Sequence, residues 1–151
     1  MGLTYSSEVA RPPADVFAYV TDPSTFPQWQ QGVVRGRLDT PTTQVGSKCT
    51  TVRKIGGRER EVTTQITECD PPRRWADRGI DGPIRAIIKV AVEPLEDASH
   101  SRVTIDVDFA GHGIGRLLVP LVVRRQAASE MPGNMRRLKE RLESRPQEGV
   151  G

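Results

Sequence analysis

Two short turn signals, Gly56-Gly57 and Asp81-Gly82, constrain the fold of this chain more than any other feature. Such dipeptides favour two-residue β-hairpin turns, because glycine adopts the positive φ angles that these turns need. Each dipeptide stands between runs of residues typical of β-strands. The sequence therefore predicts two antiparallel hairpins, formed by residues 47–55 with 58–69 and by residues 73–80 with 83–94.

The spacing of apolar residues predicts the other elements. Further strands are expected over residues 3–10, 32–39 and 100–111, where inward apolar and outward polar residues alternate in the last strand. A short helix is expected over residues 13–20 and a helical turn over residues 24–30. Apolar residues then recur at three- and four-residue steps over residues 114–143, which predicts a long helix that Pro120 and Pro132 kink or locally break.

This order of elements predicts an α+β fold. A meander of six or seven antiparallel strands cannot bury one face by itself, so the single long helix must cover that face. We therefore expect a curved antiparallel sheet wrapped around the C-terminal helix, with two short helices after the first strand. Residues 1–145 are expected to form one domain and residues 146–151 a disordered tail.

Composition excludes several classes of protein. The 151 residues carry 22 basic and 19 acidic side chains, a formal net charge of +3, and the arginines are spread along the chain. A nucleic-acid-binding protein would concentrate them with interleaved aromatics, so no nucleic-acid partner is expected. The longest apolar run, residues 117–123, is too short to span a bilayer, and no signal peptide is recognisable. We expect a soluble, cytoplasmic protein.

Several segments resemble one known superfamily. They are Glu8 to Pro23 (EVARPPADVFAYVTDP), Phe26 to Trp29 (FPQW), Val45-Gly46, Thr67 to Arg73 (TECDPPR) and Leu138 to Glu143 (LKERLE). In this order they resemble the START-like, helix-grip superfamily, also called SRPBCC, which includes polyketide cyclases/dehydrases and lipid carriers. The resemblance covers nearly the whole chain and implies the fold described above, with a ligand cavity between sheet and helix. It implies no particular chemistry, because the matching residues are structural.

The two hairpins predict which residues face that cavity. A tight turn at Gly56-Gly57 pairs Lys48 with Gln65 on the outer face, and a tight turn at Asp81-Gly82 pairs Trp75 with Ile88 and Asp77 with Ala86 on the inner face. The alternative interpretation is that the inward side chains simply fill the core. The expected cavity wall comprises Cys49, Thr51, Val62, Thr64, Ile66, Trp75, Asp77, Ala86, Ile88, Val90, Ile105, Val107, Phe109, Leu117, Leu121 and Ala128.

Asp77 and His112 are the candidate catalytic residues. An isolated buried carboxylate is unfavourable, so Asp77 is expected to act either as a polar anchor or as an acid/base with a raised pKa. The alternatives are a hydrated position at the cavity mouth or pairing with an arginine. His112, between two glycines, is either close to the mouth or an ordinary loop residue.

No motif for a metal, a phosphate group or a dinucleotide is present, so no cofactor or metal is expected. Cys49 and Cys69 fit no metal spacing, and the hairpin register separates them, so both are expected as free thiols.

Three functions remain open from the sequence. The first is a carrier or sensor that binds a hydrophobic or aromatic small molecule. The second is an enzyme of the polyketide cyclase/dehydratase type, which can work by holding substrate geometry without a strong catalytic motif. The third is an interaction module that uses its arginines, including Arg124-Arg125 and the basic residues 136–141, for transient contact with a membrane surface or a protein. The ligand and the oligomeric state are not encoded in any recognisable pattern.

Overall fold

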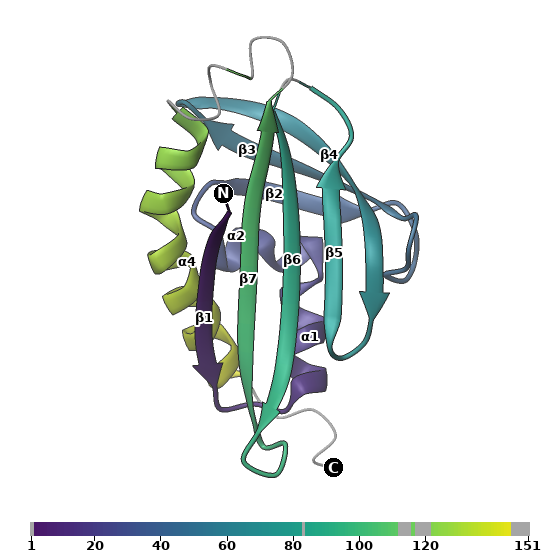
Figure 1. Cartoon of the computed structure of the whole chain (residues 1–151), viewed down its shortest axis with the longest axis vertical. Coiled ribbons are helices and arrows are strands. Elements are labelled where there is room, and N and C mark those ends of the chain that lie inside the picture. The colour runs from purple at the N-terminus through teal and green to yellow at the C-terminus, as the bar shows by residue number, and fades with distance from the viewer. Residues whose placement is uncertain (1, 83, 112–115, 117–121, 146–151) are drawn as a thin grey trace.

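The structure is a computed structural model that describes residues 2–82, 84–111, 116 and 122–145. A curled sheet wraps around one long helix, and one short helix lies behind the lower part of the sheet with another near mid-height (Figure 1). The elements are β1 (Leu3–Val9), α1 (Pro13–Val20), η1 (Pro23–Thr25), α2 (Phe26–Trp29), β2 (Val33–Leu38), β3 (Lys48–Ile55), β4 (Arg58–Asp70), β5 (Arg74–Gly79), β6 (Ile84–Leu95), β7 (His100–Gly111) and α4 (Arg124–Ser144).

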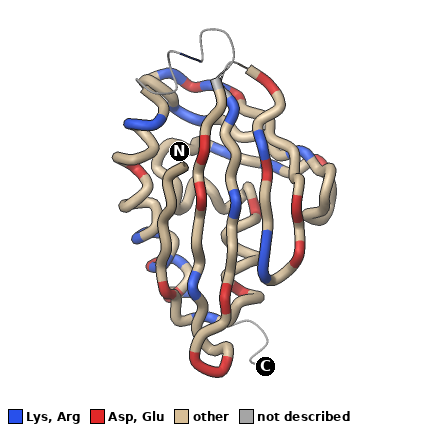
Figure 2. Tube along the Cα trace, in the orientation of Figure 1, with Lys and Arg blue, Asp and Glu red and all other residues tan. Residues whose placement is uncertain are grey.

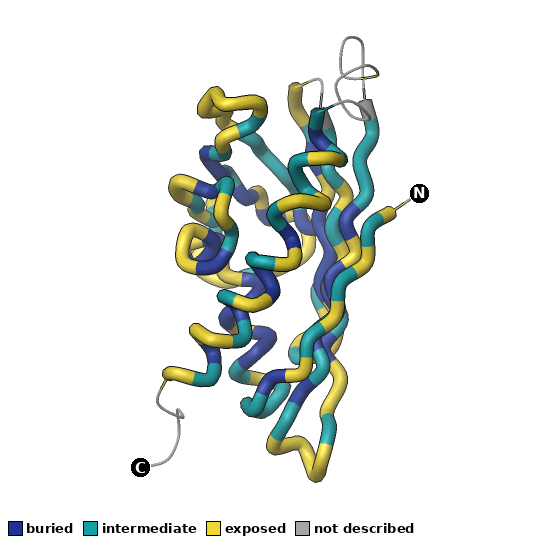
Figure 3. Tube along the Cα trace, turned by 90° about the vertical axis from the view of Figure 1, so that its left-hand side faces the viewer, coloured by how far each residue is buried: buried dark blue, intermediate teal, exposed yellow. Residues whose placement is uncertain are grey.

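All seven strands belong to one antiparallel sheet. The strand order is β1-β7-β6-β5-β4-β3-β2, so β2 to β7 form a meander and the first strand pairs with the last. Buried residues line the surfaces on which the sheet and α4 face each other, while the outer surfaces are exposed (Figure 3). The predicted α+β fold is confirmed, including the two short helices after the first strand.

The register of β3 and β4 is the one that the Gly56-Gly57 turn predicts. Gly56 and Gly57 have φ angles of +60° and +82°, which a two-residue hairpin turn needs and which side chains with a Cβ rarely adopt. Lys48 lies opposite Gln65, and Cys49 lies opposite Thr64. A turn specified by two glycines thus sets which residues of both strands face the helix.

The predicted register of β5 and β6 is wrong by two residues. Trp75 pairs with Val90, and Asp77 pairs with Ile88. A two-residue turn at Asp81-Gly82 would pair Ile80 with Pro83, but proline has no N–H to donate to that pair. The strands instead end at Gly79 and begin at Ile84, so the connection has four residues. Because the shift is even, every side chain keeps its expected face.

Helix α4 packs one apolar stripe against the concave face of the sheet. Met131, Met135, Leu138 and Leu142 are buried on this stripe. Ala128, which we expected on the same stripe, is exposed. At 100° per residue it lies at the edge of the stripe, and Ala127 lines the interior in its place.

The predicted break at Pro132 does not occur, because α4 continues through this exposed residue. Of the predicted helix over residues 114–143, residues 114–115 and 117–121, which include Pro120, lie outside the described residues, as does the expected disordered tail, residues 146–151. No helix within the described ranges is long and apolar enough to cross a membrane.

Candidate ligand cavity

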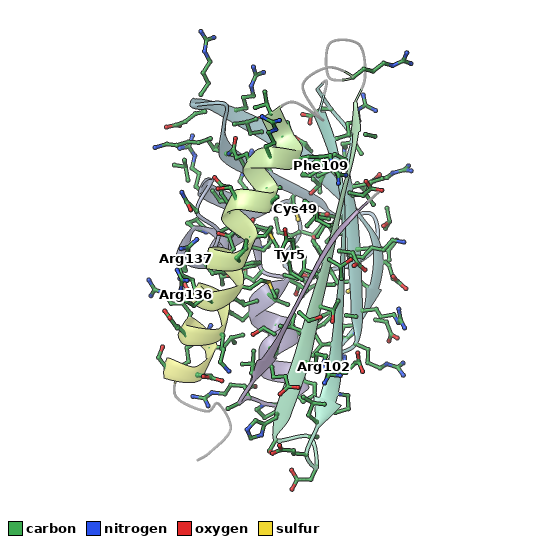
Figure 4. The ribbon with its side chains drawn as sticks, turned by 60° about the vertical axis from the view of Figure 1, so that its left-hand side comes forward. Tyr5, Cys49, Arg102, Phe109, Arg136 and Arg137 are labelled. Atoms are coloured by element: carbon green, nitrogen blue, oxygen red, sulfur yellow. The ribbon has the colours of Figure 1, made fainter. Side chains whose placement is uncertain are left out.

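A cavity of about 160 Å³ lies between the concave face of the sheet and the helices α2 and α4. Its size is close to that of a cavity of about 150 Å³ that binds benzene in another protein. Most of its wall is apolar. Figure 4 shows Phe109, which lines the cavity, on the side of the sheet that faces α4, whereas Arg136 lies on the outer side of the helix.

Ten residues predicted for the cavity wall are found there. They are Val62, Thr64, Trp75, Asp77, Ala86, Ile88, Val90, Ile105, Val107 and Phe109. All ten lie on β4 to β7, where inward and outward residues alternate. The two-residue shift in the register of β5 and β6 does not change which residues point inward. Their role in binding a ligand remains a prediction.

The other predicted residues divide into three groups. Cys49, Thr51 and Ile66 are buried but do not line the cavity. Ala128 is exposed and does not line it either. Leu117, Leu121 and His112 lie outside the described residues.

The helices and the connection after α2 supply wall residues that strand alternation cannot reveal. Phe26, Trp29 and Gln30 approach from α2 and its end, and Val123, Ala127, Glu130, Met131 and Asn134 approach from the C-terminal helix and the residue before it. Trp29 is only 3% exposed and forms part of this wall. The Oδ1 atom of Asn134 accepts a hydrogen bond from the backbone N–H of Gln31 at 2.9 Å, which ties α4 to the connection after α2.

Arg53 is the most important wall residue that the sequence analysis missed. It lies on β3 and shares the inward parity of Cys49 and Thr51, so extending the alternation by one step would have found it. Its Nε donates to Oγ1 of Thr51 at 3.0 Å, and its Nη1 donates to Oε1 of Gln30 at 3.1 Å. Burial lowers the pKa of Arg53, while the charges of Asp77 and Glu130 oppose this effect.

Asp77 is the most deeply buried acidic group of the cavity wall. The residue is 5% exposed, and its Oδ2 accepts a hydrogen bond from Oγ1 of Thr64 at 2.8 Å. Its Oδ1 has no hydrogen-bond partner among the described residues. Burial raises the pKa of Asp77 to about 6, and the Thr64 hydroxyl and the Arg53 charge partly counteract this rise. A carboxyl group with such a pKa can donate or accept a proton near neutral pH.

Two buried indole N–H groups also lack a hydrogen-bond partner among the described residues. They are Nε1 of Trp29 and Nε1 of Trp75. Buried polar groups without partners are uncommon in folded proteins. Nε1 of Trp29, Nε1 of Trp75 and Oδ1 of Asp77 are three such groups, and all three belong to side chains of the cavity wall.

The two cysteines are free, as expected. Burial, with the neighbouring charge of Asp77, raises the pKa of the Cys49 thiol to about 12. Cys49 is therefore an inert core residue and not a nucleophile.

Gln126 connects α4 to the β3–β4 hairpin at one end of the cavity. Its Nε2 donates to the carbonyl oxygen of Lys54 at 2.7 Å, and its Oε1 accepts from the backbone N–H of Gly56 at 3.1 Å. One side chain thus links the helix to the hairpin by two hydrogen bonds.

Solved structures of several proteins share this fold. The Zhui aromatase/cyclase from Streptomyces sp. R1128 has a TM-score of 0.78 and 14% identity over 100% of this chain and 98% of its own. A START superfamily protein from Mycobacterium smegmatis has a TM-score of 0.74 and 15% identity over 94% and 97% of the two chains. The di-domain ARO/CYC protein BexL has a TM-score of 0.72 and 16% identity over 95% of this chain, which spans only 46% of BexL.

The curled sheet, the gripped helix and the cavity between them define a helix-grip fold. The family described as polyketide cyclase/dehydrase and lipid transport matches residues 2–143, and the chain belongs to this family. No curated protein matches the sequence.

Proposed function

We propose that this protein binds a hydrophobic small molecule in the cavity between sheet and helix and serves as its carrier or sensor. The observation that carries the proposal is the cavity itself. About 160 Å³ is bounded mainly by apolar side chains, among them Ile88, Val107 and Phe109, with a smaller number of polar side chains from β3–β5, the end of α2 and α4. Apolar pockets with a small number of placed polar groups are typical of small-molecule sites.

Filling the cavity should weaken the binding of an apolar ligand, whereas the same substitution one residue away should leave binding nearly unchanged. Ala86 lines the cavity, and Ile87, its neighbour on β6, is 37% exposed on the other face. We expect Ala86→Trp to weaken the binding of toluene at least about tenfold, a change of about 1.4 kcal/mol. The expected effect of Ile87→Trp is less than about twofold. NMR titration with toluene measures both affinities.

Overpacking at position 86 can lower the free energy of unfolding by about 1–3 kcal/mol, so thermal unfolding must first show that both variants are folded. Equal affinity for toluene in the folded Ala86→Trp and Ile87→Trp proteins would contradict binding in this cavity.

A second candidate function is an enzyme of the polyketide cyclase/dehydratase type acting on an apolar substrate. Asp77 favours it, because a carboxyl group with a pKa of about 6 inside the cavity can transfer protons at neutral pH. The likeness to an aromatase/cyclase supports it only through the shared fold. Turnover of an added polyketide substrate that is lost in Asp77→Asn would favour the enzyme over the carrier.

Contact with a membrane surface or a protein remains a further prediction. Lys and Arg residues occur on the β3–β4 hairpin and at the start of α4, close to the end of the cavity that Gln126 bridges (Figure 2). Acidic residues of the same hairpin, including Glu59 and Glu61, interrupt this basic region. The structure therefore gives this role less support than it gives the cavity.

A further inference from the structure

Arg53 and Asp77 form an incomplete charge pair in the cavity wall. They lie on β3 and β5, both line the cavity, and their charges attract each other. They nevertheless make no direct ion pair or hydrogen bond: the bonds of Arg53 go to Thr51 and Gln30, and that of Asp77 comes from Thr64.

Each member of the pair has one atom left without a partner. Among the described residues, Nη2 of Arg53 forms no hydrogen bond, and no donor reaches Oδ1 of Asp77. The first atom is a donor and the second, in the ionised carboxylate, is an acceptor. A hydroxyl group is the smallest neutral group that can both accept from the one and donate to the other.

The charges around the pair disfavour an anionic ligand. Glu130 also lines the cavity, and its charge acts on Arg53 together with that of Asp77. Lys54 also lines the cavity, but it is exposed and has the outward parity of β3. Around Arg53, one guanidinium therefore meets two carboxylates when all three groups are ionised. A ligand carboxylate would add a further negative charge in a poorly solvated space, which is unfavourable.

We propose that Arg53 and Asp77 in the cavity wall select a neutral ligand of single-ring size by one hydroxyl group, which donates to Oδ1 of Asp77 and accepts from Nη2 of Arg53. This inference rests on the proposed function, because it assumes that the cavity takes up a small molecule. It adds the chemical class of the ligand and its orientation, with the hydroxyl group toward β3–β5 and the ring against the apolar residues of β6 and β7.

Five ring-sized probes separate the possibilities: phenol, anisole, toluene, benzoate and benzylammonium. Anisole keeps the oxygen acceptor of phenol but lacks the donor, and toluene lacks both. Hydrogen bonds to charged groups contribute about 1.5–3 kcal/mol, so phenol should bind at least about tenfold more tightly than anisole or toluene. Calorimetric or NMR titration at pH 7.5 measures all five affinities.

The variant Asp77→Asn tests the donor half of the contact. If the asparagine oxygen keeps the bond from Thr64, an NH₂ group replaces Oδ1 and cannot accept the phenol proton. The preference for phenol over anisole should then fall from at least about tenfold to about onefold. The apolar control Ile88→Val should weaken the binding of phenol, anisole and toluene by similar factors and keep the preference.

Arg53→Met tests the acceptor half. It should reduce the affinity for phenol and anisole relative to toluene, since both oxygens lose the same donor.

The outcomes distinguish this inference from the proposed function. Toluene binding without a preference for phenol, or tighter binding of benzoate or benzylammonium than of phenol, would overturn the hydroxyl selection and leave the cavity as a binding site. Failure of the folded protein to bind any of the five probes would overturn the proposed function itself.

Discussion

Replacing Asp77 with asparagine should raise the free energy of unfolding at pH 7 by up to about 3 kcal/mol. Burial raises the pKa of this carboxyl from its ordinary value of 3.8 to about 6. Each pKa unit corresponds to about 1.4 kcal/mol, so the folded protein bears an energetic cost for holding this group ionised at neutral pH. Asparagine removes the charge, and its oxygen can still accept the hydrogen bond from Thr64.

The difference in stability between the natural protein and Asp77→Asn should depend on pH, because the pKa of Asp77 is higher in the folded chain than in the unfolded chain. Below about pH 4 the carboxyl is protonated in both the folded and the unfolded chain, so the natural protein and the Asp77→Asn variant should differ little in the contribution of this position. Between about pH 4 and 6 the unfolded chain loses the proton first, so the stability of the natural protein falls as the pH rises. Above about pH 6 the cost is constant, and Asp77→Asn should not show this fall.

Urea unfolding of both proteins at pH 4 and pH 7 measures the effect. A gain that is present at pH 7 and small at pH 4 is expected. A loss of about 3–5 kcal/mol at pH 7 would instead mean that Asp77 belongs to a buried ion pair whose partner the substitution strands.

Leu138→Ala should lower the free energy of unfolding by about 2–5 kcal/mol. Leu138 is 0% exposed at the centre of the stripe through which α4 contacts the sheet. Truncation to alanine removes buried apolar surface and leaves a void that the surrounding side chains fill only in part. Chemical denaturation measures the loss.

Glu140→Ala is the matched control, because Glu140 lies two residues away on the exposed side of the same helix. Its effect should stay within about 0.5 kcal/mol. Similar effects of the two substitutions would show that α4 does not pack on the sheet through this stripe.

The strand framework of the cavity could be predicted from the sequence because local turn chemistry determines it. Gly56-Gly57 specifies a two-residue turn, and the turn determines which residues of β3 and β4 face inward. At Asp81-Gly82 the same reasoning gave the wrong partners, because Pro83 cannot donate the hydrogen bond that a tight turn requires. The inward faces were still correct, since an even shift of register preserves them.

The rest of the cavity depends on tertiary packing, which strand alternation does not encode. The position of α2 brings Trp29 and Gln30 to the wall, and the rotation of α4 about its axis exposes Ala128 and turns Ala127 inward. Arg53 is different, because its inward parity was visible in the sequence. A charged residue near a hairpin tip is usually solvated, whereas here Thr51 and Gln30 hold Arg53 at the cavity.

The central claim, that a small molecule enters the space between the sheet and α4, can be tested by intermolecular nuclear Overhauser effects between toluene and the methyl groups of the protein. Ile88 and Val107 line the cavity, whereas Ile87 lies beside Ile88 on the outer face. The structure predicts contacts from toluene to the methyl groups of Ile88 and Val107 and none to those of Ile87. Contacts only to Ile87 and other exposed methyl groups, or no contacts at saturating toluene, would contradict it.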